Sequence, residues 1–340
     1  MKYAKLFSIL VFSIMSLYGA AGFYFLPLAT FQAELTRMAM LPEAMFGWTK
    51  PQPAIDPALM HQSSWREADV LVVGDSFSDG RIWQTILTKA GLRVRTESWD
   101  SVRGICEDFM PWVREQGFNG KYIVFESVER NIADGVARSV ACKQMQFHPS
   151  IYADMPRGTP MTSFNPNQGD YSGKLSVGIQ TLIRSWQYER LSRTPDFKGW
   201  DLPNGVKMAR VNHGCDLFSH AKCNDALFLV HDRIEELPEN TLDNIAKLNE
   251  RLPEIKPIWV FVPNKSTTYL YSTKKFWDEA ERRFAAPNLL HMTQQAIQNK
   301  IVDLYPANNT HFSTTGYLLM GDAVYQAIAP SVHPELKEAH

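Results

Sequence analysis

From about residue 67 onward, short apolar runs alternate with stretches in which apolar residues recur every three or four positions. The apolar runs, rich in valine, isoleucine and aromatic residues, predict strands at 68–73, 92–97, 122–126, 226–230, 257–262 and 301–304. The longer period predicts helices at 81–90, 108–116, 174–191, 241–251, 274–284 and 314–328. Such alternation is typical of a mostly parallel sheet covered on both faces, so we predict an α/β fold.

The first apolar run differs from the others, because it extends over 28 residues without a charge between Lys5 and Glu34. A bilayer-spanning helix needs roughly 20 apolar residues, whereas the core of a signal peptide has about 7–15. Lys2 precedes the run together with Lys5, and the positive-inside rule therefore keeps the N-terminus in the cytoplasm. We expect an uncleaved anchor, with a signal peptide cleaved near the small residues 18–22 as the alternative.

Composition shifts divide the rest of the chain. Residues 38–64 are rich in proline, methionine and glutamine without a sustained period, and they read as a linker. A proline-rich stretch interrupts the strand and helix alternation and reads as an insertion, with a β-hairpin expected around Gly205–Val211. We therefore predict a cytoplasmic N-terminus and transmembrane anchor at 1–33, a linker at 34–65, one domain at 66–330 with an insertion at 143–225, and a tail at 331–340.

The overall composition supports a globular protein and excludes some partners. Of 340 residues, 45% are hydrophobic and 21% are charged, with a net charge of -1. These values argue against disorder. Without a basic stripe interleaved with aromatic residues, we expect no nucleic-acid partner.

The four cysteines are Cys106, Cys142, Cys215 and Cys223. An exported domain lies in an oxidising compartment, where disulfides are permitted. Cys215 and Cys223 enclose a short polar loop and are the best candidate pair, which leaves Cys106 with Cys142 by elimination. Histidines lie beside the second pair, but no C-x-x-C occurs and the spacing matches no zinc pattern, so we expect no metal site.

Two short motifs near the ends of the chain carry the candidate chemistry. Gly74-Asp75-Ser76-Phe77-Ser78 follows an apolar strand and precedes a helix, which puts Ser76 at the C-terminal edge of the sheet. Asn308-Asn309-Thr310-His311-Phe312-Ser313 supplies a histidine just before the last helix. A serine hydroxyl is a poor nucleophile until a base removes its proton, and His311 is the candidate base. We expect Asp75 to fix the turn rather than to act as an acid.

These motifs resemble those of the SGNH/GDSL hydrolase superfamily, and within it the O-acetyltransferases of bacterial exopolysaccharide modification, the alginate type. The resemblance covers roughly residues 66–330. Three further elements are similar to that family: Val128-Glu129-Arg130, Phe261-Val262-Pro263-Asn264-Lys265 followed by Tyr269, and Thr310-His311-Phe312. Here the serine motif precedes the histidine motif, which is the order of ordinary SGNH hydrolases and not of the alginate enzymes.

The resemblance implies a flavodoxin-like SGNH sandwich with a mostly parallel sheet. It also implies serine-dependent O-acetyl transfer to hydroxyls of a cell-surface or secreted polysaccharide, without a cofactor. The catalytic domain would face the periplasm from a single-pass anchor in a bacterial inner membrane. A polytopic membrane acyltransferase would supply acetyl groups as a partner. The alternatives are an SGNH esterase that removes acyl groups, and a catalytically silent scaffold that binds polysaccharide within an export complex.

The remaining site residues are expected from the same resemblance. The family carries an aspartate two or three residues before its histidine, and here these positions are Asn309 and Asn308. Either asparagine can orient His311 through its carbonyl oxygen, Asp303 can take that role, or the site is slow or inactive. The family's oxyanion donors would be the backbone N–H groups of Ser76 and Gly104.

Three further residues are candidates for substrate binding. Arg130 follows a strand end and can bind an acyl or sugar oxygen, or pair with Glu129 or Glu126. Lys265 and Tyr269 follow another strand end, where a solvated loop is the alternative. A sugar-stacking platform is a further hypothesis, although core packing is the favoured interpretation of its tryptophans: Trp83, Trp99, Trp112 and Trp186.

Overall fold

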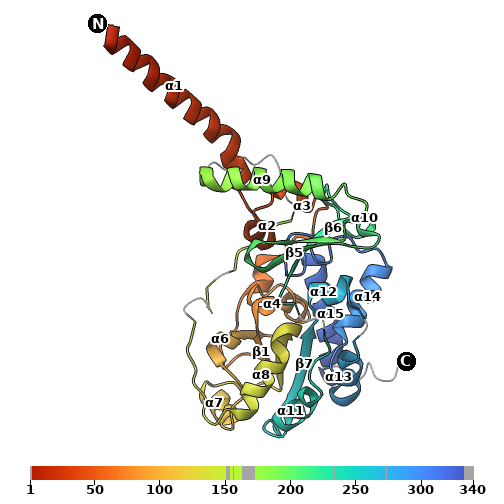
Figure 1. Ribbon diagram of the computed structural model, residues 1–340. Coiled ribbons are helices and arrows are strands. Elements are labelled where there is room, and N and C mark those ends of the chain that lie inside the picture. Colours follow the sequence, from red (N-terminus) through yellow and green to blue (C-terminus); the bar gives the residue numbers. More distant parts are fainter. Residues whose placement is uncertain are drawn as a thin grey trace. The chain divides into compact units, whose positions relative to one another are not determined.

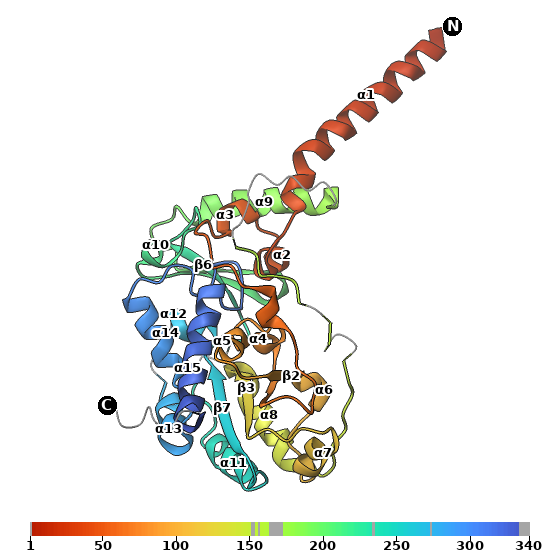
Figure 2. The same ribbon diagram turned by 180° about the vertical axis from the view of Figure 1, so that it is seen from behind.

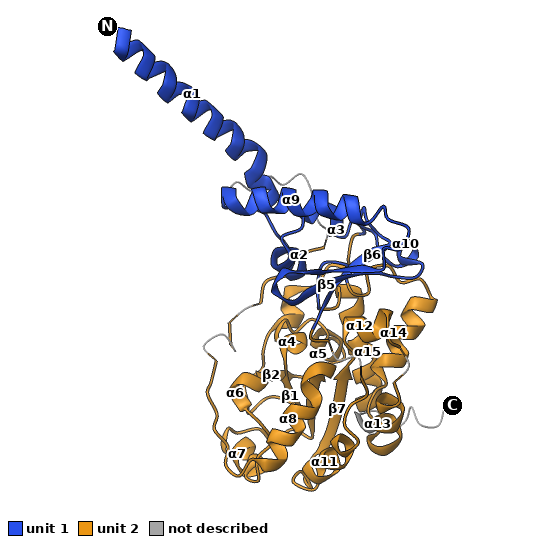
Figure 3. Ribbon diagram, in the orientation of Figure 1, with its two compact units in different colours: residues 1–50, 163–230, 306–310 blue, residues 51–162, 231–305, 311–340 orange. Residues whose placement is uncertain are grey.

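The structure is a computed structural model that describes residues 2–150, 154–155, 157–162, 173–232, 235–272 and 274–332. Part of the expected insertion and residues 333–340 of the expected tail lie outside the described residues. The chain divides into two compact units (Figure 3). Unit 1 comprises residues 1–50, 163–230 and 306–310, and unit 2 comprises residues 51–162, 231–305 and 311–340.

Unit 2 is built on a parallel four-stranded sheet of order β2-β1-β3-β7 (Figure 1). Its strands are β1 (Val70–Gly74), β2 (Val94–Ser98), β3 (Tyr122–Val128) and β7 (Lys256–Val262). All four correspond to apolar runs of the sequence, so the predicted parallel α/β sheet is confirmed. Because side chains alternate along each strand, residues of β1 face two different cores: Leu71 and Val73 one, Val70 and Val72 the other.

Helices cover both faces of this sheet. The core containing Leu71 packs against α6 (Trp99–Val102), α7 (Phe109–Glu115), α8 (Glu129–Ala141), α11 (Asn240–Asn249) and α13 (Phe276–Phe284). The core containing Val70 packs against α4 (Ser76–Asp79), α5 (Gln84–Lys89), α14 (Leu289–Gln298) and α15 (Thr314–Val332). The shorter elements of the unit are η2 (Pro57–Met60) and α12 (Lys265–Tyr269). Unit 2 therefore has three layers, with the sheet in the middle.

Unit 1 contains an antiparallel sheet of order β4-β5-β6, made of β4 (Gly199–Leu202), β5 (Val206–Arg210) and β6 (Asp225–Leu229). The first two strands form the expected hairpin around a 3-10 turn, η3 (Pro203–Gly205). Its helical elements are α1 (Lys2–Phe25), η1 (Leu26–Ala29), α2 (Glu34–Ala39), α3 (Glu43–Phe46), α9 (Leu175–Leu191) and α10 (Gly214–Leu217). Leu35, Leu41 and Phe46 share an apolar core with Tyr188 and residues of the sheet.

Helix α1 continues into η1, and together they are long and apolar enough to cross a membrane, with a mean hydropathy of 1.9 and no buried residue. Figure 2 shows α1 as one continuous helix. This is the one membrane-spanning candidate among the described residues. The expected single N-terminal apolar helix is therefore present.

Both expected disulfides are present, Cys106–Cys142 and Cys215–Cys223. The first links the loop before α7 to the end of α8 in unit 2, and the second closes a short loop in unit 1. They are compatible with an oxidising compartment.

Three expectations are corrected. Residues 34–50 are not a spacer, because α2 and α3 bury apolar side chains in unit 1. Strand β6 belongs to the antiparallel sheet and not to the parallel one. Residues 301–304 form no strand, since Lys300 and Asp303 have left-handed φ values of 54° and 57° that break an extended run. Helices α8 and α14 were not predicted.

Candidate active site

The turn after β1 is shaped by Gly74 and Asp75. A Cβ at Gly74 would lie 2.3 Å from the Ser78 hydroxyl and 2.7 Å from a carboxylate oxygen of Glu126, so only glycine fits. Asp75 caps α4 by accepting a hydrogen bond from the Phe77 N–H at 3.0 Å. Its second oxygen accepts from the Val128 N–H at 2.8 Å, which ties the turn to the end of β3. Asp75 therefore has the expected role in fixing the turn.

Glu126 lies directly beneath this turn and was not singled out from the sequence. One of its oxygens accepts hydrogen bonds from the Asp75 N–H at 3.0 Å and from the Ser78 hydroxyl at 2.7 Å. The other has no hydrogen-bond partner among the described residues. Complete burial, and then the nearby charge of Asp75, hold the pKa of Glu126 well above its ordinary value of 4.5. Burial therefore favours the protonated form of Glu126, which supports the turn.

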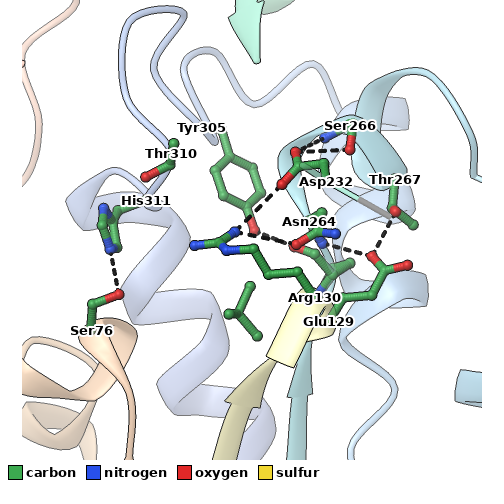
Figure 4. A network of polar contacts seen from close by, with 12 residues as sticks. Ser76, Glu129, Arg130, Asp232, Asn264, Ser266, Thr267, Tyr305, Thr310 and His311 are labelled. Carbon is green, nitrogen blue, oxygen red and sulfur yellow. Dashed lines mark hydrogen bonds and ion pairs between the residues drawn. The ribbon is translucent and has the colours of Figure 1, made fainter. Parts of the chain in front are cut away.

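Ser76 and His311, the candidate nucleophile and base, lie side by side in unit 2. Ser76 is exposed at the first position of α4, and His311 precedes α15. The His311 Nε2 and the Ser76 Oγ are 2.8 Å apart, and Figure 4 shows the two groups facing each other. The imidazole also packs on the Phe77 ring, with ring centroids 4.9 Å apart. The sequence motifs thus meet at hydrogen-bond distance, as a serine nucleophile and its base require.

The three residues that could orient His311 have hydrogen bonds or neighbours of their own. The Asn308 side-chain amide donates to Glu43 within unit 1, and its carbonyl oxygen has no hydrogen-bond partner among the described residues. Asn309 also belongs to unit 1, where its N–H donates to the Pro306 carbonyl at 3.1 Å. Asp303 is fully buried in unit 2, close enough to Tyr269 to affect the pKa of that phenol. Which of the three orients His311 stays a prediction.

The expected oxyanion donors differ in their availability. None of the hydrogen bonds among the described residues uses the Ser76 N–H, which is therefore free to bind a ligand. The Gly104 N–H instead donates to the Val102 carbonyl at 2.9 Å. The interpretation of Gly104 as the second donor is corrected here, because its N–H is already engaged within its own turn.

Arg130 supplies a fixed cation beside the pair. Its guanidinium lies 3.5 Å from an Asp232 carboxylate oxygen and 3.3 Å from the Asn264 side-chain oxygen, and 21% of its side chain is exposed. In Figure 4 the guanidinium points from these partners toward the side on which Ser76 and His311 lie. An ion pair with Glu129 or Glu126 was the alternative role that the sequence analysis allowed for Arg130. The structure instead pairs Arg130 with Asp232. It is held ready to bind an oxygen of a ligand.

A buried network joins the ends of β3 and β7 behind Arg130. Glu129 accepts hydrogen bonds from the Asn264 N–H at 2.9 Å and from the Thr267 hydroxyl at 2.6 Å, and it pairs with Lys274. Burial raises the pKa of Glu129, and these donors oppose the rise. The two motifs that contain Glu129 and Asn264 thus form one rigid support.

Asp232 anchors Arg130 and was not predicted. Its carboxylate accepts from the Ser266 hydroxyl at 2.8 Å. Burial raises the pKa of Asp232, while Ser266, Arg130 and Lys265 favour its ionised form. Lys265 is buried at the start of α12, and the Tyr269 hydroxyl accepts from the Tyr305 N–H at 3.2 Å. Lys265 and Tyr269 are therefore packed into the fold and do not lie on a solvated loop.

A cavity of about 390 Å³ opens beside Ser76 and extends along the sheet face covered by α6, α8 and α11. Its mouth carries Asp75, Asp100 and Arg103. Its inner wall is apolar and buried, formed by Ile105, Phe125, Val136, Leu248, Trp259 and Phe261. This cavity was not predicted, because its walls come from elements that are far apart in the sequence.

Comparison with protein-family models, curated protein sequences and solved structures finds no match to this chain. The groups named above therefore carry the functional argument by their geometry.

Proposed function

We propose that this protein transfers acyl groups through an acyl-enzyme formed on Ser76. The Ser76 Oγ attacks the carbonyl carbon of an ester while His311 Nε2 accepts the hydroxyl proton. The Ser76 N–H and the Arg130 guanidinium stabilise the oxyanion. The imidazolium returns the proton to the leaving alcohol, and the acyl group stays on Ser76. His311 then deprotonates an acceptor hydroxyl, which attacks the acyl-enzyme and releases Ser76.

The observation that carries this proposal is the 2.8 Å contact between His311 Nε2 and an exposed Ser76 Oγ at the C-terminal end of β1. This edge is where open parallel sheets bind ligands. The three-layer α/β architecture of unit 2 supports an SGNH-type, flavodoxin-like domain.

For the acceptor, we propose hydroxyls of a cell-surface or secreted polysaccharide, with acetyl as the group that the sequence motifs favour. The apolar helix α1, the two lysines in its first turn and the two disulfides support an inner-membrane anchor and a periplasmic catalytic domain. Because activated acyl donors are cytoplasmic, this arrangement requires a polytopic membrane acyltransferase as a partner.

Hydrolysis is the second candidate. Ser76 is exposed, so water can reach the acyl-enzyme in place of a sugar hydroxyl. The protein would then be an esterase that removes acyl groups with the same residues. Release of free acetate from an acetylated polysaccharide, compared with net gain of acetyl groups on an unmodified one, separates the two directions.

The direct test is labelling of the full-length protein by a fluorophosphonate. We expect the adduct on Ser76, its loss in Ser76→Ala, and at least a hundredfold slower labelling in His311→Ala. Ser64→Ala is the matched control, because Ser64 is an exposed serine paired with Glu67 and not with a histidine. An adduct on another residue, or none in folded wild-type protein, would refute the acyl-enzyme and favour the silent scaffold.

A further inference from the structure

The cavity beside Ser76 is far larger than an acetyl group needs. An apolar cavity of about 150 Å³ already accommodates benzene, and this one measures about 390 Å³. Its mouth adjoins Ser76, so a chain entering it would start at the acyl carbonyl. By the same scale the whole cavity would hold roughly 15 carbons, so a chain confined to its apolar inner part is roughly half as long.

We propose that this cavity binds the alkyl chain of a medium-chain acyl group, of roughly six to ten carbons. The inference rests on the proposed acyl-enzyme and concerns which acyl group it carries. The cavity favours a longer group than the acetyl that the sequence motifs favour. Serines and Asn131 also line the cavity, but the Ser139 hydroxyl already accepts from the Ile105 N–H at 3.1 Å. The apolar part of the inner wall offers no partner to the hydroxyls of a sugar, whose burial against it would leave polar groups unpaired. An alkyl chain has no such groups and gains free energy with each methylene buried.

Helix α8 forms one wall of the cavity and contains the position that tests its use. Gly135 lies in this wall, and a Cβ built there would meet no atom within 4 Å. A larger side chain at this position would therefore extend into open space in the cavity. Glycine is also the weakest helix former apart from proline, so replacing it does not weaken α8 by propensity.

The experiment compares kcat/KM for p-nitrophenyl acetate, hexanoate and octanoate with the full-length protein in one detergent. Each buried methylene is worth roughly fourfold in kcat/KM. We expect octanoate to exceed acetate by at least tenfold in the wild type, and Gly135→Phe to lower this ratio at least tenfold. Ala137→Phe is the matched control, because Ala137 is exposed on the same helix outside the cavity and should keep the ratio.

A wild-type preference for acetate, or an octanoate preference unaffected by Gly135→Phe, would overturn the acyl-chain pocket. Failure of the catalytic proposal gives a different result, which is no turnover of any ester. In that case, binding of carbon-13-labelled octanoate to the Ser76→Ala protein in nanodiscs, measured by NMR, still tests the cavity. Binding that Gly135→Phe weakens at least tenfold supports the pocket, and absent binding refutes it.

A second inference rests on helix α9 in unit 1. Gly178, Thr181 and Tyr188 face the interior of the unit. On the opposite side, Ile179 and Ile183 are exposed, and Trp186 keeps 64% of its surface accessible. Positions 179, 183 and 186 repeat at helical spacing and form one outward stripe. Core packing, which the sequence analysis favoured for Trp186, is therefore wrong for this residue.

The N-terminal part of α9 packs directly on the end of the apolar helix α1. A Cβ at Gly178 would lie 2.0 Å from the Phe25 carbonyl oxygen, so this glycine permits close contact of the two backbones. Figure 1 shows α9 running across the end of α1. Helix α9 therefore lies at the end of the segment that is apolar enough to cross a membrane, and its exposed stripe faces away from that contact.

We infer that α9 lies in the membrane interface, with Ile179, Ile183 and Trp186 inserted at the boundary between lipid headgroups and acyl chains. An amphipathic helix at this depth buries its apolar stripe, and tryptophan is favoured there. Arg190 is exposed four residues beyond Trp186 on the same side of the helix, where it can contact anionic headgroups. Unit 1 would then rest on the lipid surface through α9 as well as through α1.

The test is quenching of tryptophan fluorescence by brominated lipids in vesicles containing the full-length protein. The chain has 9 tryptophans and none lies in α1, so the signal reports on other segments. We expect lipids brominated at a shallow acyl position to quench the tryptophan fluorescence of the wild type. Most of this quenching should be lost in Trp186→Phe. Trp200→Phe, which changes a half-buried tryptophan of the same unit, should keep it. Absent quenching, or quenching unchanged in Trp186→Phe, would overturn the inference.

Discussion

The side-chain amide of Asn308 donates a hydrogen bond to the carboxylate of Glu43, and both residues are buried in unit 1. Glu43 also accepts from the Thr36 hydroxyl and from the Gln32 N–H at 3.3 Å. Burial raises the pKa of Glu43, while these donors oppose the rise. Asn308, three residues before His311 in the sequence, is thus also a structural residue of unit 1.

This contact predicts different outcomes for the two asparagines. Asn308→Asp removes the amide donor and sets a second carboxylate against Glu43, so we expect a loss of about 1–3 kcal/mol in the free energy of unfolding. Asn309→Asp makes no such contact with Glu43 and should be tolerated. Chemical unfolding of both full-length variants measures the difference, and Glu43→Gln combined with Asn308→Asp should recover part of the loss. Equal stability of the two single variants would contradict the argument.

Arg130 is predicted to stabilise the transition state. Arg130→Ala removes the cation that points toward the reacting pair, so kcat for p-nitrophenyl acetate should fall roughly 10²- to 10³-fold with a smaller change in KM. Asp232→Asn keeps the arginine but weakens its anchor, and should have a smaller effect in the same direction. Steady-state kinetics with kcat and KM reported separately measure this. An unchanged kcat in Arg130→Ala would remove the residue from the mechanism.

Glu126 is predicted to make stability depend on pH. Because its pKa is raised in the folded protein, its contribution to stability is full below the ordinary value of 4.5 and is lost as the pH rises through the raised value. Glu126→Gln resembles the neutral acid and keeps an acceptor for Asp75 and Ser78. Its melting temperature should therefore fall less than that of the wild type between acidic and alkaline pH. Parallel curves for the two proteins would refute a raised pKa.

The two disulfides should differ in their contribution to stability. Cys106 and Cys142 are 36 residues apart, and Cys215 and Cys223 are 8 residues apart. From loop entropy, removing the first should cost about 4 kcal/mol and removing the second about 2.5 kcal/mol. Unfolding of the paired Cys→Ala variants measures both. A larger cost for the short loop would mean that contacts around it, and not chain entropy, decide its contribution.

The sequence predicted the parallel sheet well because three of its strands, β1, β3 and β7, are buried and mostly apolar runs. It did not predict that β6 leaves this sheet, since an apolar run does not say which strand it will pair with. That choice depends on distant partners, such as the Ala307 carbonyl that accepts from the Leu227 N–H at 2.9 Å. Helix α8 did have a signal, because Ile132, Val136 and Val140 repeat every four residues.

Some residues of the candidate site were likewise predictable from the sequence, and others were not. Ser76 and His311 were predictable because each belongs to a short motif with a recognisable context. Glu126 could have been noticed as a carboxylate that directly follows the apolar run 122–125, which is a costly place for a charge. Asp232 belongs to no motif, and only the folded chain brings it to Arg130, 102 residues away in the sequence.

The bond between Glu43 and Asn308 also sets an order of events in time. The two residues are 265 positions apart, so the α2–α3 segment leaves the ribosome long before its partner does. At typical rates of synthesis the delay is roughly 15–50 s. During this interval Leu35 and Phe46 can pack with Tyr188 and the antiparallel sheet, but the Glu43 carboxylate lacks its Asn308 donor. The polar contacts at the start of unit 1 are therefore completed only when its last segment is synthesised.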